Sequence, residues 1–118
     1  MNPNRVKSML KKGETALGTW VTIANPDVAE ILSNMTFDWL VFDTEHGPLS
    51  IETVQWMIAA TSATQVVPLV RVGFNDMVEI KRALDIGACE SQRHSGQLCR
   101  IVRNVVLADA WRKRRRKA

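Results

Sequence analysis

The amino-acid sequence predicts an α/β fold built on a parallel β-sheet. Two observations lead to this class: strand-like segments alternate with segments of helical periodicity, and the second and third strand-like segments are apolar almost throughout. Alternation of strands and helices favours right-handed βαβ crossovers, and long apolar runs are typical of strands buried on both faces. A closed barrel and an open doubly wound sheet share this pattern, so periodicity alone leaves both possible.

The chain is predicted to begin with a short helix followed by a strand. Asn2-Pro3 can open the helix and Gly13 can end it, because Asn caps helices and Pro is tolerated in the first turn. Leu17–Ile23 is rich in β-branched and aromatic residues, which favours a strand. The segment lacks a G-x-G-x-x-G turn, so the usual argument for a nucleotide site is absent.

Two further strand–helix units and a final helix follow. Asn25-Pro26-Asp27 and Ser50 are predicted to start helices, and Asn75 to cap another one that Gly87 ends. The expected inner faces are Val28, Ile31, Leu32 and Met35 in the first of these helices, Ile51, Val54, Met57 and Ile58 in the second, and Val78, Ile80, Ala83 and Leu84 in the third. The intervening strands are predicted at Phe37–Asp43 and Val66–Val72.

The regular pattern stops after Ala88. Residues 89–97 carry no strand signal where a fourth strand is due, and the charge changes at the same point. Residues 1–88 have a net charge of −3, whereas residues 89–118 have +7. We therefore predict a βα segment over 1–88 and an atypical basic tail over 89–118, helical or disordered, as a reading-frame shift or truncated gene would produce.

The tail ends in six consecutive basic residues, Arg112–Lys117. Such a run can bind phosphates, but no aromatic interleaving or zinc spacing accompanies it, so a solvated terminus is the favoured interpretation over nucleic-acid binding. Cys89 and Cys99 are interpreted as free thiols. No segment reaches the roughly 20 apolar residues of a membrane helix, and we expect a cytoplasmic protein without a membrane partner.

Polar residues that can carry chemistry gather at strand ends. Asp43, Glu45 and His46 follow the second strand, and Arg71 lies at the end of the third. A histidine beside carboxylates can act as an acid or base, and an arginine can hold a carboxylate or a developing oxyanion. Equally, the two acids can bond only loop amides and Arg71 can pair with an acid on the neighbouring strand. Spacing alone places Trp20 in the core.

Six motifs carry a resemblance to a known family. They are Gly18-Thr-Trp20, Asn25-Pro26 with Ala29-Glu30, Phe37-Asp-Trp-Leu-Val, Asp43-Thr-Glu-His-Gly-Pro48, Val70-Arg-Val72 and Ile80-Lys-Arg-Ala-Leu-Asp-Ile-Gly-Ala88. Over about residues 4–88 the chain resembles the N-terminal part of the HpcH/HpaI aldolases. The resemblance implies an N-terminal helix and about three βα units of a (β/α)8 TIM barrel.

The resemblance also implies a function. Members of the family are divalent-metal-dependent aldolases, using magnesium, manganese or cobalt, that cleave 4-hydroxy-2-keto acids to pyruvate and an aldehyde, and they are usually homo-oligomers. By position His46 is the acid or base, oriented by Asp43, and Glu45 supports the loop. Arg71 stabilises the enolate or carbonyl oxygen, and Trp20 lines the pocket.

One departure from the family limits this expectation. The family's metal-binding glutamate and aspartate lie on later strands, and neither Glu90 nor Asp109 has the context of those ligands. We therefore expect no metal ligands in this chain and little turnover by the chain alone. The alternatives are a non-enzymatic remnant that acts through self-association or its basic tail, and a fragment that joins a complementary chain to complete a barrel.

Overall fold

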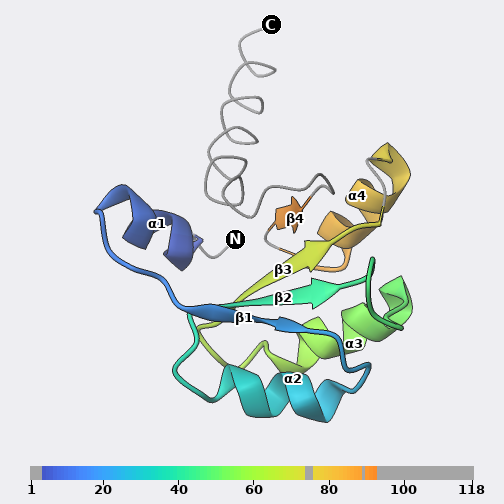
Figure 1. Cartoon of the computed structure of the whole chain (residues 1–118), viewed down its shortest axis with the longest axis horizontal. Coiled ribbons are helices and arrows are strands. Elements are labelled where there is room, and N and C mark those ends of the chain that lie inside the picture. The colour runs from blue at the N-terminus through green and yellow to red at the C-terminus, as the bar shows by residue number, and fades with distance from the viewer. Residues whose placement is uncertain (1–3, 74–75, 89, 93–118) are drawn as a thin grey trace, which may run out of the picture.

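The computed structural model describes residues 4–73, 76–88 and 90–92, and it confirms an α/β fold with a parallel sheet. The strands lie in the order β1-β2-β3-β4, and every pairing is parallel (Figure 1). The elements in chain order are α1 (Arg5–Lys11), β1 (Gly18–Val21), α2 (Pro26–Ser33), β2 (Trp39–Asp43), α3 (Ile51–Ala60), β3 (Val67–Arg71), α4 (Met77–Asp85) and β4 (Glu90–Gln92).

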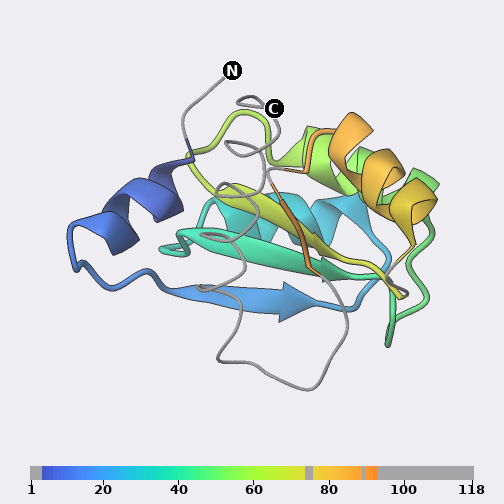
Figure 2. The same cartoon turned by 90° about the horizontal axis from the view of Figure 1, so that it is seen from above.

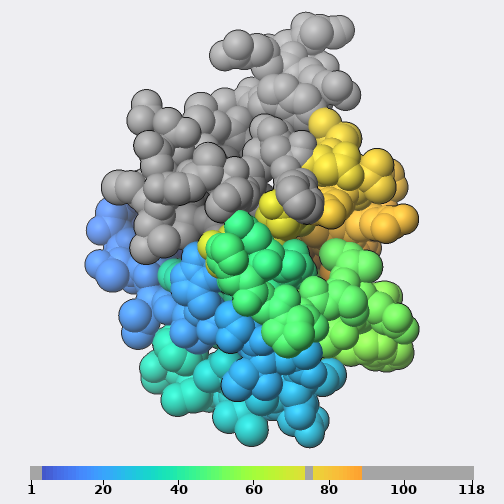
Figure 3. All heavy atoms as spheres, turned by 45° about the vertical axis from the view of Figure 1, so that its right-hand side comes forward, coloured from blue at the N-terminus to red at the C-terminus, as the bar shows by residue number. Residues whose placement is uncertain are grey.

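The two faces of the sheet have different partners. Alternate strand residues such as Val21, Phe42 and Val70 belong to the larger apolar cluster, which α2, α3 and α4 cover (Figure 2). The three helices follow one another along the outside of the molecule, α2 in blue to cyan, α3 in light green and α4 in orange (Figure 3). On the other face Val41 and Leu69 belong to a second cluster.

Helix starts follow the predicted signals in two of four cases. The side chains of Asn25 and Ser50 accept hydrogen bonds from the second or third helical amide, as predicted. The first helix is capped by Asn4 instead of Asn2, because the Asn4 side chain accepts from Lys7 N at 3.1 Å. The cap of α4 is Asp76 instead of Asn75. Both errors arise where a second capping residue lies within two positions, because either one satisfies the preference.

The predicted inner faces are correct for α3 and partly wrong for α2 and α4. Val54 and Met57 are fully buried, whereas Ile31, Met35 and Val78 are 64%, 56% and 55% exposed. Ala83 of α4 is fully buried, as predicted, and α2 buries Ala29, which was not predicted. Ala29 was missed because a small residue contributes little to the apolar periodicity from which the inner face is identified.

The expected absence of a fourth strand is wrong. Glu90–Gln92 pairs with β3, with Leu69, Val70 and Arg71 opposite its three residues. The segment has little strand propensity of its own, so the pairing comes from the adjacent edge of β3 and not from local preference. The preceding helix ends at Gly87 as predicted, with a φ of 104° that favours glycine.

Beyond Gln92 the predictions for the tail lie outside the described residues, as do those for Cys89 and Cys99. Within the described ranges, no helix is both long and apolar enough to cross a membrane.

Asp38 connects four elements at the amino end of the sheet. Its carboxylate pairs with Arg5 of α1 at 2.9 Å and accepts from Leu17 N at 2.9 Å. Its backbone donates to the carbonyl oxygen of Leu17 at 2.6 Å and accepts from Val67 N at 2.9 Å. The start of β2 is thereby attached to α1 and to the starts of β1 and β3.

Gly18 is required by the packing of Trp39, its register partner on β2. A Cβ at Gly18 would lie 1.9 Å from Trp39 Cδ2, which is closer than any real contact. We predict that Gly18→Ala destabilises the chain by about 1–3 kcal/mol, as overpacking does, measured as a shift of the urea midpoint. In a Trp39→Leu background the same change should cost much less, and an equal cost in both backgrounds would contradict this explanation.

Candidate active site

An ion pair joins the carboxyl ends of β2 and β3. Asp43 and Arg71 are the last residues of these strands and are register partners. Arg71 Nε donates to Asp43 Oδ1 at 2.9 Å, and Arg71 Nη2 donates to Asp43 Oδ2, so the contact is bidentate. Asp43 is only 2% exposed. The alternative that Arg71 pairs with an acid on a neighbouring strand is therefore observed.

The loop after β2 is held from both strands. Asp43 Oδ1 accepts hydrogen bonds from the backbone amides of Glu45 and His46, at 3.0 and 3.1 Å. The amide and the hydroxyl of Thr44 both donate to the carbonyl oxygen of Arg71, at 3.1 and 2.5 Å. Asp43 thus bonds loop amides as well as a guanidinium, and the next three residues are fixed relative to β3.

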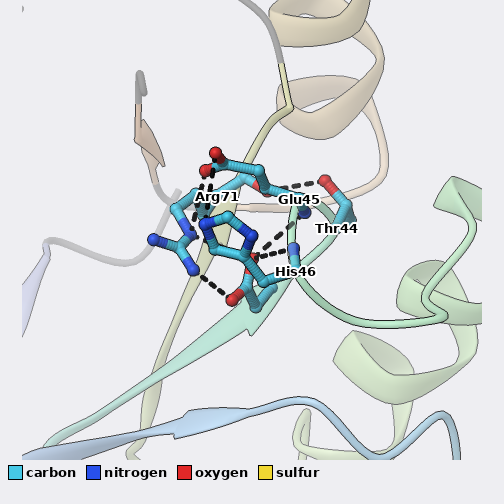
Figure 4. A network of polar contacts seen from close by, with 5 residues as sticks. Thr44, Glu45, His46 and Arg71 are labelled. Carbon is cyan, nitrogen blue, oxygen red and sulfur yellow. Dashed lines mark hydrogen bonds and ion pairs between the residues drawn. The ribbon is translucent and has the colours of Figure 1, made fainter. Parts of the chain in front are cut away.

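The side chains of Glu45, His46 and Arg71 converge at this edge of the sheet (Figure 4). Glu45 Oε1 lies 3.3 Å from His46 Nε2, and Glu45 Oε2 lies 3.4 Å from Arg71 Nε. The Glu45 side chain is 12% exposed, whereas the imidazole of His46 is 62% exposed and open to solvent. Asp43 acts on the backbone of His46, and the carboxylate that contacts the ring is that of Glu45.

Trp20 packs against the apolar cluster on this face of the sheet, as spacing predicted, and its role in a substrate pocket stays a prediction. Its side chain packs against Val41 and Leu69, its neighbours across the sheet. Its ring also lies under the guanidinium of Arg71, with 4.4 Å between Arg71 Cζ and the ring centroid, which is a cation–π contact. The structure therefore brings Trp20, Asp43, Glu45, His46 and Arg71 together, as the sequence predicted.

Asp43 has a lowered pKa and Arg71 a raised one. Burial alone would raise the pKa of Asp43, but the hydrogen bond from Arg71, the two backbone hydrogen bonds from His46 and Glu45 and the charge of Arg71 together outweigh it. The hydrogen bond to Asp43 is the main cause of the raised pKa of Arg71, with the charges of Asp43 and Glu45 adding to it. Both groups are ionised at neutral pH.

An open hollow of about 570 Å³ lies beside these residues. Thr44 and Glu45 form part of its wall together with Val72 and Gly73, and Glu79 and Arg82 of α4 contribute further charges. His46 and Arg71 do not line it, so Glu45 is the member of the site that both regions share. Glu79 and Arg82 were not among the predicted site residues, although their spacing of three places both on one helix face.

The described residues do not form a metal site. Among them, no group of three or more His, Cys, Asp and Glu side chains is arranged to hold a metal ion. The two carboxylates nearest to His46 are already engaged with the single positive charge of Arg71. The divalent metal expected from the family resemblance therefore does not fit the residues described here.

Comparison with known proteins gives the family. The sequence profile of the HpcH/HpaI aldolase/citrate lyase family matches residues 16–91. This chain belongs to that family. A solved structure of a family member from Burkholderia cenocepacia covers 73% of the chain at 34% identity, with a TM-score of 0.68, and the match covers 35% of that protein. The family structures are TIM barrels, so the four parallel strands correspond to part of a (β/α)8 barrel.

Two curated relatives are named as aldolases. The hydroxypyruvate/pyruvate aldolase of Sagittula stellata is 41% identical over 85 residues, which are 72% of this chain and 34% of the relative. The 4-hydroxy-2-oxo-heptane-1,7-dioate aldolase of Salmonella dublin is also 41% identical over 85 residues, 72% of this chain and 32% of the relative. The chain thus spans about a third of the length of these relatives.

The family fold identifies the face of the sheet on which the site lies. In a (β/α)8 barrel the helices lie outside and the opposite face of the sheet lines the interior. Asp43 and Arg71 alternate with the residues that face the helices and share a face with Trp20. Active sites in this fold form at the carboxyl ends of the strands, where these side chains are found.

The ion pair predicts an acid-dependent loss of stability. We expect Asp43→Asn to lower the free energy of unfolding at pH 7 by about 3 kcal/mol, because it leaves Arg71 without its buried partner. A lowered pKa means that the carboxylate contributes in full above about pH 4, the ordinary value for Asp, and that its contribution is lost as the pH falls through the folded-state pKa.

The free energy of unfolding is measured by urea denaturation for wild type and for Asp43→Asn. The difference between the two values should be constant from about pH 5 to 8 and shrink below about pH 4. The exposed Asp27 gives a matched control, and Asp27→Asn should cost less than about 1 kcal/mol. A wild-type advantage that persists undiminished at pH 2 would show that the carboxylate charge is not its source.

Proposed function

We propose that this chain carries the acid–base and oxyanion-stabilising part of an aldolase site that cleaves 4-hydroxy-2-keto acids to pyruvate and an aldehyde. The observation that carries the proposal is the convergence of His46, Glu45 and Arg71 at the carboxyl ends of β2 and β3. Family membership and the aldolase names of the curated relatives support the same reaction class.

His46 is proposed to move the proton of the aldol hydroxyl. In the cleavage direction, a base takes the proton from the C4 hydroxyl, the C3–C4 bond breaks, and its electron pair enters the enolate of the keto acid. The aldehyde leaves, and protonation at C3 then gives pyruvate. The exposed imidazole of His46 is accessible to such a hydroxyl, and histidine is the commonest general base.

Arg71 is proposed to stabilise the negative oxygen that develops on the enolate. Its guanidinium is fixed by Asp43 on one side and by the ring of Trp20 on the other. A donor that is already in place stabilises a developing charge without reorganisation in the transition state. Trp20 contributes an apolar wall beside the same oxygen.

The remaining expectations are part of the proposal. A divalent metal, with magnesium, manganese or cobalt as candidates, would polarise the keto-acid carbonyl when bound. Because the described residues do not fit it, we propose that its ligands lie outside them and that the chain alone lacks full turnover. A cytoplasmic homo-oligomer is likewise proposed by analogy with the family.

A first test uses the chain alone. We expect ¹⁵N-labelled protein titrated with pyruvate to show shifts centred on Arg71 and His46, and Arg71→Ala to abolish them. Retro-aldol assays with a 4-hydroxy-2-keto acid, with and without magnesium, manganese or cobalt, should give little turnover. Metal-dependent turnover by the chain alone would contradict the proposal that ligands are missing.

A second test supplies the rest of the barrel. The aligned 85 residues of the Salmonella aldolase are replaced by those of this chain, and pyruvate release by the chimera is measured. We expect turnover, with kcat reduced about 10²–10⁴-fold by His46→Ala and about 10²–10³-fold by Arg71→Ala. Glu14 is exposed, and Glu14→Ala serves as a control that should leave kcat unchanged. A folded but inactive chimera would favour the non-enzymatic alternative.

A further inference from the structure

We infer that Glu45 is a positioning residue that holds both the imidazole of His46 and the guanidinium of Arg71, and does not merely support the loop. The inference deepens the proposed function, because it concerns how the two groups assigned to the reaction are kept in place. Glu45 acts through these two side chains, so it is distinct from the residues that would contact substrate.

The carboxylate of Glu45 makes one contact with each of the two groups. Its Oε1 lies 3.3 Å from His46 Nε2 and its Oε2 lies 3.4 Å from Arg71 Nε. One carboxylate thus spans an acid–base candidate from the loop and an oxyanion candidate from the next strand. Since the side chain is 12% exposed, the carboxylate has little space in which to move.

Asp43 already uses both of its carboxylate oxygens elsewhere. Oδ1 accepts from Arg71 Nε and from the amides of Glu45 and His46, and Oδ2 accepts from Arg71 Nη2. Asp43 therefore fixes where the loop leaves β2, and Glu45 fixes where the ring points. The two carboxylates have different roles because of where they lie: Asp43 ends the strand and Glu45 lies two residues into the loop.

Exposure explains why the ring needs this contact. The imidazole of His46 is 62% exposed, so packing alone leaves its side-chain torsions with considerable freedom. Contacts from neighbouring side chains are commonly needed to keep a reacting group in a productive orientation.

The test measures the order of the His46 ring in the full chain without substrate. Ring C–H relaxation is recorded by ¹³C NMR and assigned with His46→Gln, since the chain has two histidines. We expect an order parameter of about 0.85 in wild type, as for a rigid backbone, and below about 0.6 in Glu45→Ala. Glu14→Ala, an exposed glutamate between α1 and β1, should match wild type.

A second variant keeps the inference testable if Glu45→Ala does not fold. Glu45→Asp keeps the charge but draws the carboxylate back by one methylene, so the ring should again become mobile. Equal ring order in wild type and variants would overturn the inference. Shifted backbone amides over residues 44–48 with an ordered ring would also overturn it, because that result indicates loop support alone.

The proposed function can fail separately. If pyruvate leaves the Arg71 and His46 signals of the wild type unchanged while Glu45→Ala still frees the ring, the positioning contact stands and the aldolase assignment does not. If pyruvate binds and the ring is unaffected by either substitution at Glu45, the aldolase assignment stands and the positioning role is excluded.

Discussion

The bidentate pair between Asp43 and Arg71 is the interaction on which the rest of the site depends. The two residues face each other across β2 and β3 at one register position, so strand pairing and ion pairing specify the same alignment. A slip of one residue would turn each side chain to the opposite face of the sheet. Because Asp43 also accepts two loop amides, one carboxylate links sheet register to loop conformation.

Asp38 has a comparable role at the opposite end of β2. It joins Arg5, Leu17 and Val67 through its side chain and backbone, whereas Asp43 joins the loop and β3. The central strand thus carries a carboxylate at each end, and between them lies the fully buried segment Leu40–Phe42. Polar contacts fix the ends of the strand, while burial of apolar surface holds its middle.

Much of this arrangement follows from local sequence. The strands around Trp39–Asp43 and Val67–Arg71 are identified by apolar character, and side chains at the carboxyl ends of adjacent parallel strands must lie close together. Local sequence does not reveal which carboxylate contacts which partner. Asp43 and Glu45 both lie within three positions of His46 in the sequence. In the structure Asp43 pairs with Arg71 across β2 and β3, and Glu45 is the carboxylate that contacts the ring.

The errors have a related cause. Glu90–Gln92 becomes a strand because it pairs with the edge of β3, and Ile31 is exposed whereas Ala29 of the same helix is buried against its neighbours. In each case a neighbouring element overrules a local preference. The choice of Asp76 over Asn75 as a cap is of a different kind, since two suitable residues stand side by side and propensity barely separates them.

The contacts that define the site also have a consequence for how it forms during folding. Asp43 and Arg71 are separated by 28 positions along the chain, and Glu45 and His46 lie between them, so a single βαβ unit contains the whole polar network. The entropic cost of closing a loop grows only slowly with its length. The polar network therefore requires only that β2 and β3 pair, and none of its contacts depends on β1 or β4.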